Sequence, residues 1–155
     1  MVIMPRELKP GDNWAVDIAV LAEGHLLLIR RGDGGGWALP GGFLETGDRT
    51  NRDGMVRELR EETGLIVDPD QIAVPGGRFL VDDPRNGNGN WISTVIGFVY
   101  LSSIAPVAGG DDAVEARWVP LAEAHVMDRM LAVETGVGMY RCHLPSIDRI
   151  NEEVS

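Results

Sequence analysis

Residues 41–65 read GGFLETGDRTNRDGMVRELREETGL, and glutamates recur in this stretch at helical spacing. Glu58, Glu61 and Glu62 occupy positions i, i+3 and i+4, so in a helix their carboxylates share one face and their tips converge. Converging carboxylates repel one another unless a cation lies between them. Because hard divalent cations prefer oxygen ligands, the spacing predicts a Mg²⁺ or Mn²⁺ site on this helix.

The flanking residues support a helix from about residue 50 to residue 63. Thr50 with Asp53 three residues later predicts a modified capping box, and Gly64 predicts a left-handed cap at the other end. The Pro40-Gly41-Gly42 turn lets the backbone approach an anion or a metal closely. The side of the helix expected to face a core carries Met55, Val56, Leu59 and Thr63.

The length and composition fit one compact domain over residues 1–155, with a core at about 12–135 and a short C-terminal extension. No run of 18 apolar residues occurs, so we expect no membrane span, and the N-terminal segment does not read as a signal peptide. The single cysteine, Cys142, excludes an internal disulfide framework and predicts a reducing, cytoplasmic environment.

The chain is acidic, with a formal net charge of −10. This charge argues against nonspecific binding to nucleic acid or to an anionic membrane, so we expect neither partner. A phosphate-bearing substrate would have to be met by a metal or by local positive charge, because the overall field opposes it.

Hydrophobic patterning predicts a mixture of strands and two main helices. The second helix is expected over 121–134, and the segment after 137 is weakly patterned, with at most a short terminal helix. This order predicts one α/β or α+β sandwich. The expected strands cover residues 14–21, 25–30, 37–39, 78–82, 91–101 and 113–119.

The 41–65 segment resembles the Nudix box, the signature of the Nudix hydrolases. Gly42 matches the opening glycine of the family pattern, and residues 57–65 match its second half in full. Asp48 stands where the pattern has a glutamate, and one extra residue, near Gly54, separates it from Arg57. Over about residues 12–135 the resemblance implies a mixed β-sheet packed between helices.

The resemblance also implies how the acidic helix works. Its three glutamates would hold one to three divalent ions, with the Gly42 carbonyl as a further ligand, and the ions would activate a water that attacks a pyrophosphate. Arg57, expected on a different helix face, would pair with Glu45 or with Asp48 and tie the loop to the helix.

The general base is the least constrained role. Asp111, Asp112 and Glu115 precede or begin the strand that ends at Trp118, and an acid there could reach the metal ligands from the other side. We favour Asp112 as the base, with Glu58 as the competing residue.

Two short stretches, 82–91 (DDPRNGNGNW) and 108–119 (AGGDDAVEARWV), are similar to the ADP-ribose pyrophosphatase branch of the family. Arg85 and Arg78 are candidates for binding a phosphate, since guanidinium is a forked donor. The histidines, His25, His125 and His143, show no metal-ligand spacing and are expected to have ordinary structural roles. Candidate aromatic faces for a nucleobase are Trp14, Trp91 and Phe43.

These features predict a Mg²⁺-dependent pyrophosphohydrolase acting on a nucleoside diphosphate linked to another moiety. ADP-ribose, giving AMP and ribose 5-phosphate, is the preferred substrate; nucleoside triphosphates, oxidised nucleotides, NADH and nucleotide sugars are alternatives. A non-catalytic nucleotide sensor and a purely structural domain are alternatives of other classes. The sequence leaves open whether the chain is a monomer or a homodimer.

Overall fold

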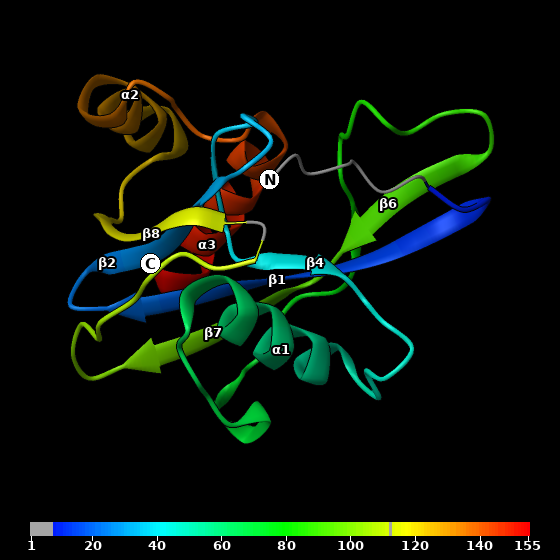
Figure 1. The fold of residues 1–155 in the computed structure, drawn as a ribbon, viewed down its shortest axis with the longest axis horizontal. Coiled ribbons are helices and arrows are strands. Elements are labelled where there is room, and N and C mark those ends of the chain that lie inside the picture. Colours follow the sequence, from blue (N-terminus) through cyan, green and yellow to red (C-terminus); the bar gives the residue numbers. More distant parts are fainter. Residues whose placement is uncertain (1–7, 112) are drawn as a thin grey trace.

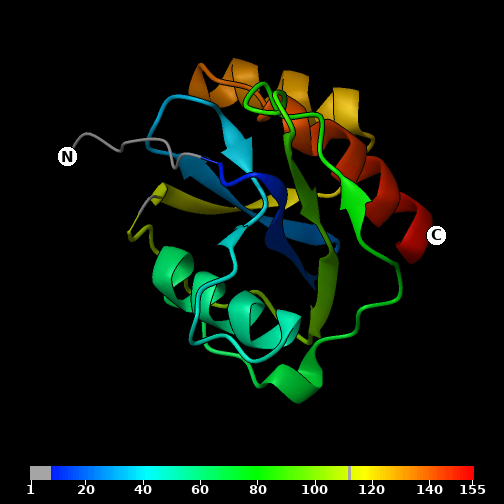
Figure 2. The same cartoon turned by 90° about the vertical axis from the view of Figure 1, so that its right-hand side faces the viewer.

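The computed structural model describes residues 8–111 and 113–155. A mixed eight-stranded sheet lies between helices, as expected for the sandwich (Figures 1 and 2). Helix α1 (Asn51–Thr63) covers one face, and α2 (Ala124–Thr135) and α3 (Leu144–Val154) cover the other. Two short 3₁₀ helices, Pro69–Gln71 and Arg141–His143, complete the helical elements of the described residues.

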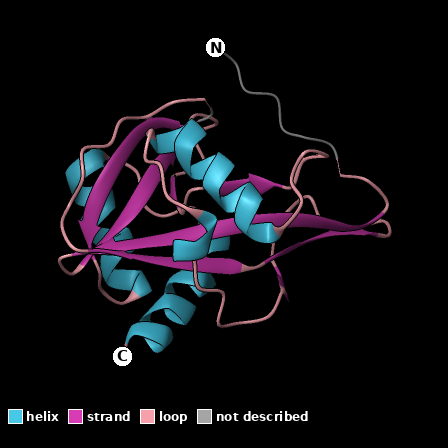
Figure 3. Ribbon diagram, turned by 90° about the horizontal axis from the view of Figure 1, so that it is seen from below, coloured by secondary structure: helices cyan, strands magenta, loops and turns pink. Residues whose placement is uncertain are grey.

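Strand β1 (Gly11–Ala22) is the centre of the sheet. It runs antiparallel to β2 (His25–Arg31) and β4 (Gly41–Phe43), and parallel to β6 (Asn90–Thr94) and β7 (Ile96–Leu101). The N-terminal part of β1 and β6 extend together beyond the helices (Figure 3). The remaining strands pair with β2 or β6 and are β3 (Trp37–Ala38), β5 (Phe79–Leu80) and β8 (Ala113–Pro120).

Both faces of β1 are buried, which explains why its sequence reads as an almost continuous apolar run. Val16 and Ile18 belong to the core on the α1 side, with Leu59. Ala19 and Leu21 belong to the core on the α2 and α3 side. Alternate side chains of a strand point to opposite faces, so this one strand contributes to both cores.

The prediction of one long strand over 91–101 is wrong in one respect, because the segment forms two strands with an interruption at Val95. The register with β1 is unbroken: Trp14 pairs with Ser93, and Asp17 pairs with Ile96. The interruption faces the part of β1 that also pairs with β4. Here β1 passes from a small sheet with β6 and β5 into the larger sheet with β7 and β2.

The C-terminal part of the chain differs most from its weak sequence pattern. Helix α2 begins at Ala124 instead of Leu121, because the Leu121 N–H donates to the Gly24 carbonyl at 2.9 Å and holds this segment extended. The tail forms α3, whose Ile147 and Ile150 are fully buried in the core shared with α2. Within the part of the chain that the structure describes, no helix is long and apolar enough to cross a membrane.

Candidate active site

Helix α1 begins and ends as its sequence predicts. The Thr50 hydroxyl accepts from the Asp53 N–H at 3.1 Å, while the Asp53 carboxylate accepts from the Arg49 N–H. The capping box is therefore not reciprocal, because the Asp53 carboxylate accepts from the Arg49 N–H and not from the Thr50 N–H. Gly64 adopts a left-handed conformation, with φ of 76°, and donates to the Arg60 carbonyl. These caps fix which face of α1 meets the sheet and which carries the glutamates.

The Arg57 guanidinium lies between the loop and the acidic helix. It donates to both Asp48 oxygens, at 2.8 and 3.1 Å, and contacts Glu45 at 3.3 Å. It also donates to Glu58 at 2.9 Å and to Glu61 at 3.3 Å. The expectation that Arg57 belongs to a separate face is therefore wrong for its guanidinium, because the long side chain reaches the carboxylates. Hydrogen bonds from Arg57 hold the pKa of Asp48 below its usual range.

Asp48, which stands where the Nudix-box pattern has a glutamate, contacts Arg57 through both carboxylate oxygens. Its carboxylate also accepts from the Glu45 N–H at 2.8 Å, which shapes the loop before α1. A Cβ on Gly54 would lie 2.6 Å from the Leu44 side chain and 3.2 Å from Asp48. Gly54 in the first turns of α1 therefore lets this longer loop pack closely on the helix.

Gly41 and Gly42, predicted as part of a turn, lie instead in strand β4, where they pack against two of the glutamates. A Cβ on Gly42 would lie 2.6 Å from a Glu58 oxygen, so the absence of a side chain lets the carboxylate approach the backbone. The buried Glu62 carboxylate accepts from the Gly41 N–H at 2.8 Å. Burial raises the pKa of Glu58 to about 7, despite its hydrogen bond from Arg57.

The three carboxylate tips do not converge as closely as the spacing predicts. Within residues 8–111 and 113–155, no three histidine, cysteine, aspartate or glutamate side chains are already gathered to hold a metal. The reason is that Arg57 binds Glu58 and Glu61, whereas Glu62 accepts from Gly41. The donor set still fits Mg²⁺ or Mn²⁺: all its atoms are oxygens, and the partly buried Glu58 has a raised pKa in the metal-free protein, which a divalent ion would offset.

Glu58, Glu61 and Glu62 line one cavity of about 640 Å³, a size usual for sites that bind small molecules. Helix α1 and strand β4 form one wall. The turn after β2 and the segments around residues 83 and 140 form the opposite wall. Besides the glutamates, the lining includes Asp17, Arg31, Phe43, Glu45, Asp83, Arg85, Asp111, Tyr140 and His143.

The opposite wall carries two arginine–aspartate pairs. Arg31 donates to both oxygens of Asp33, at 2.6 and 3.1 Å, and Arg85 donates to both oxygens of Asp83, at 2.9 and 3.0 Å. Tyr140 contacts both pairs, because its hydroxyl donates to Asp83 and its ring lies 4.1 Å from the Arg31 guanidinium carbon. Hydrogen bonds from Arg85 hold the pKa of Asp83 low, against the effect of burial.

Asp17 and His143 lie at the base of the cavity. His143 Nδ1 accepts from the Leu39 N–H at 3.0 Å, and Nε2 lies 3.7 Å from Asp17. Burial lowers the pKa of His143, so the ring is neutral. Asp17 accepts from the Thr94 hydroxyl at 2.6 Å. The sequence offers no signal for this group, since a lone histidine far along the chain has no partner at a recognisable spacing.

Of the two remote acids that the structure describes, Asp111 lines the cavity and Glu115 does not. Asp111 has φ of 52°, and its neighbour Gly110 lies so close to the Glu61 carbonyl that a Cβ would be 2.7 Å from it. Glu115 lies inside β8 and is ion-paired there. Asp112, the predicted base, lies outside the described residues.

Comparison with known proteins agrees with this geometry. Residues 12–137 match the family model described as the NUDIX domain. This chain belongs to the Nudix family.

Named relatives cover different parts of the Nudix chain. An ADP-ribose pyrophosphatase of Methanocaldococcus jannaschii is 37% identical in an alignment of 131 positions that covers 77% of this chain and 72% of the relative. A MutT-like protein of Streptomyces ambofaciens is 49% identical over 71 residues, 44% of this chain and 46% of that protein. The chain spans about half the length of this protein and of putative nudix hydrolase 6 of Caenorhabditis elegans (46% and 57%).

A solved structure shares the fold over most of this Nudix chain. It is a bifunctional NMN adenylyltransferase/ADP ribose pyrophosphatase of Francisella tularensis, complexed with AMP and a Mn ion. The TM-score is 0.69 at 25% identity, covering 95% of this chain and 43% of that chain.

Three residues predicted to bind substrate do not line the cavity in the described part of the Nudix domain: Trp14, Arg78 and Trp91. Arg78 donates to the carbonyls of Ala15 and Ser93, at 2.9 and 2.8 Å, so its donors hold the sheet together. Its guanidinium covers the Trp14 ring at 4.7 Å. Phe43 and Arg85, in contrast, line the cavity together, 5.5 Å from ring centre to guanidinium carbon.

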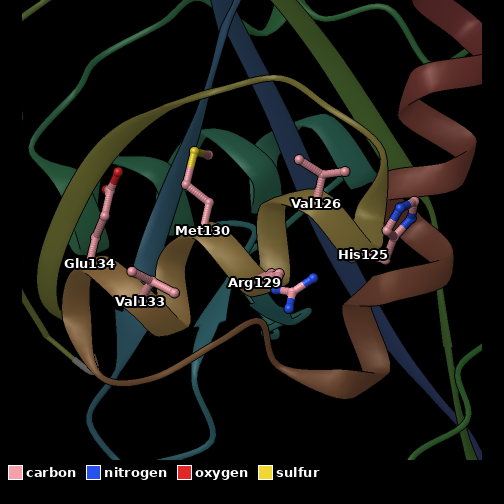
Figure 4. A pocket seen from close by; sticks show the side chains of 6 residues that line it. All are labelled: His125, Val126, Arg129, Met130, Val133 and Glu134. Atoms are coloured by element: carbon pink, nitrogen blue, oxygen red, sulfur yellow. The ribbon is translucent and has the colours of Figure 1, made fainter.

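A second hollow, of about 430 Å³, lies along α2, and its lining includes none of the three glutamates of α1 (Figure 4). All the side chains that line it come from this one helix. Val126 and Val133 give it an apolar character, and its lining also includes Arg129 and Glu134. It lacks the converging polar groups of the first cavity, which therefore remains the candidate active site.

Proposed function

We propose that this Nudix protein is a Mg²⁺-dependent pyrophosphohydrolase that cleaves ADP-ribose to AMP and ribose 5-phosphate. The observation that carries the proposal is a box helix that presents Glu58, Glu61 and Glu62 to a cavity large enough for a nucleotide derivative. The substrate assignment is supported by the relative named ADP-ribose pyrophosphatase and by Arg85, which the cavity shares with Phe43.

Glu58, Glu61, Glu62 and the Gly42 carbonyl would hold the cation. When bound, Mg²⁺ would neutralise charge on the diphosphate and lower the pKa of a water. Arg57 holds the loop before α1 against that helix, so that strand β4 and the glutamates keep their relative positions. The Gly41 N–H orients the Glu62 carboxylate from the other side.

The proton acceptor is one of two acids. Asp112 remains our predicted base, and its neighbour Asp111 lines the cavity. Glu58 is the alternative, since its carboxylate lines the same cavity as the other two glutamates. Asp112→Asn and Glu58→Gln distinguish the two, because only loss of the base removes the acidic limb of the kcat–pH profile.

The test of the proposal is release of the nucleoside monophosphate, which is AMP for ADP-ribose and NADH, with Mg²⁺ across ADP-ribose, NADH, a nucleotide sugar, a nucleoside triphosphate and an oxidised nucleotide. We expect ADP-ribose to have the highest kcat/KM, and Glu61→Gln to lower kcat by about 100-fold or more. Glu152→Gln, on the exposed surface of α3, is the matched control. If another compound of the panel has a higher kcat/KM, the substrate assignment is wrong. If nothing is cleaved but ADP-ribose raises the melting temperature, the protein is a sensor.

We further propose that the protein acts in the cytoplasm, as a monomer or a homodimer. The buried free thiol of Cys142 suits a reducing compartment. Sedimentation of the purified chain distinguishes the two assembly states.

A further inference from the structure

An anionic ligand in the main cavity meets few positive groups. Among the described residues that line it, the charged donors are Arg31 and Arg85, both on the wall opposite the acidic helix. His143 is neutral, and Arg57 is engaged by carboxylates behind the glutamates. Because a diphosphate only accepts hydrogen bonds, the two arginines are the side chains best suited to meet it without a metal.

The two guanidinium groups are held in the same manner. Each uses Nε and Nη2 to bind one aspartate, Asp33 for Arg31 and Asp83 for Arg85. In the described residues, Nη1 of either arginine makes no hydrogen bond, although both side chains line the cavity. Each fork is therefore fixed on one edge and retains a donor for a ligand on the other.

Tyr140 links the two forks into one wall. Its ring packs under the Arg31 guanidinium at 4.1 Å, and its hydroxyl donates to Asp83 at 3.2 Å, behind Arg85. Cys142 adds a contact from its thiol to the Asp82 carbonyl at 3.1 Å. Tyr140 and Cys142 follow position 137, where the match to the family model ends, whereas Arg31, Asp83 and Arg85 lie within it, so a segment outside the family match joins the two arginine–aspartate pairs.

Resting on the proposed function, we propose that Arg31 and Arg85 bind the diphosphate from the side opposite the acidic helix, with Tyr140 as their positioning residue. The Arg31–Tyr140–Asp83–Arg85 chain is named here the arginine wall. It would hold the phosphate groups independently of the cation, so that binding and metal activation come from opposite sides of the cavity.

The test is calorimetric binding of ADP-ribose and AMP to the full chain in EDTA, with adenosine as the uncharged probe. Arg31→Ala and Arg85→Ala should each weaken ADP-ribose and AMP binding about 10- to 100-fold, the loss expected for one charge-assisted hydrogen bond. Adenosine binding should be unchanged. Arg129→Ala, an exposed arginine on α2, is the matched control.

Tyr140→Phe keeps the ring under Arg31 and removes the hydroxyl, which donates to Asp83 and also contacts the Cys142 thiol. It should weaken AMP binding several-fold in the wild-type background and add little in Arg85→Ala, because the hydroxyl acts through that arginine. Tyr100→Phe, at an exposed tyrosine on β7, should leave binding as in the wild type. Additive effects of Tyr140→Phe and Arg85→Ala would contradict its role as a positioning residue.

Arg31→Lys and Arg85→Lys guard against misfolding, since they keep the charge but lose the fork, and they should weaken AMP binding less than alanine does. The arginine wall is refuted if the arginine variants bind AMP like wild type, if AMP and adenosine weaken equally, or if wild type needs metal to bind AMP. These results are independent of turnover. A chain that binds AMP through the arginines yet cleaves nothing would remove the proposed hydrolysis and leave the wall.

Discussion

The Arg57 guanidinium donates to the loop at Asp48 and to its own helix at Glu58 and Glu61. It thereby occupies part of the space between carboxylates that would otherwise repel one another. The sequence predicts the pairing with Asp48 or Glu45 because arginine and acid stand near each other across a loop. It does not reveal the contacts to Glu58 and Glu61, which depend on the direction of a long side chain.

Removal of this guanidinium tests its stabilising role. Arg57→Ala should lower the free energy of unfolding by about 1–3 kcal/mol in metal-free buffer, since it leaves the mostly buried Asp48 unpaired. Urea unfolding at pH 8 measures the change. Arg60→Ala, an exposed arginine on the same helix, should change stability by less than about 0.5 kcal/mol. Equal effects of the two variants would contradict the proposed role.

Glu58 makes stability depend on pH. Burial raises its pKa from an ordinary 4.5 to about 7 in the folded protein, so between these values the folded state binds more protons than the unfolded state. Its contribution is therefore complete below about pH 4.5 and is lost as the pH rises to about 7. We expect the metal-free protein to lose about 1–3 kcal/mol from this group over that interval.

Glu58→Gln should remove that part of the pH dependence, measured as urea-unfolding free energies at pH 5 and pH 8 in EDTA. Glu153→Gln, at an exposed position on α3, should retain it. Parallel curves for wild type and Glu58→Gln would show that the raised pKa is wrong.

At the scale of elements, α1 is predictable because caps, apolar spacing and glutamate spacing all indicate the same helix. The strand interruption at Val95 and the start of α2 at Ala124 are not, because β4 and the Gly24 carbonyl decide them from distant parts of the chain. Helix α3 has a weak sequence pattern, yet Ile147 and Ile150 supply core contacts that only the fold reveals.

Strand β4, between β3 and α1, has a strict size limit at Gly42. Gly42→Ala would place a Cβ 2.6 Å from a Glu58 oxygen, so the carboxylate must move. We expect Mg²⁺ affinity, measured by calorimetry, to fall about 10-fold. Gly47→Ala, in the neighbouring loop, is the matched control, because no atom lies within 4 Å of its added Cβ. Unchanged Mg²⁺ affinity in Gly42→Ala would show that Gly42 does not contribute to the metal site.

Helix α3 should matter for stability. Ile147→Ala empties a fully buried position between α3 and its neighbours and should cost about 2–4 kcal/mol in unfolding free energy. Val154→Ala, near the exposed end of the same helix, should cost less than about 1 kcal/mol. If both variants unfold at the same urea concentration, α3 does not belong to the cooperative core.

At the scale of the whole molecule, the site is assembled from segments far apart in sequence. The acidic wall comes from one continuous stretch, which is why its residues are predictable from the sequence alone. The opposite wall joins Arg31, Asp83 and Tyr140 through contacts that only the folded chain creates. The fold also places Trp14 and Arg78 together at the extended end of the sheet. The residues around them in the sequence do not predict this position.

The net charge of −10 makes this division of the cavity important, because the acidic wall repels a diphosphate until a cation is bound. The most direct measurement of the central claim is the initial rate of AMP formation from ADP-ribose by wild type and Glu62→Gln, with Mg²⁺ and with EDTA. The account predicts AMP formation only with Mg²⁺, and a rate about 100-fold lower or more in the equally folded variant than in wild type. Equal rates for the two proteins, or AMP formation that persists in EDTA, would contradict it.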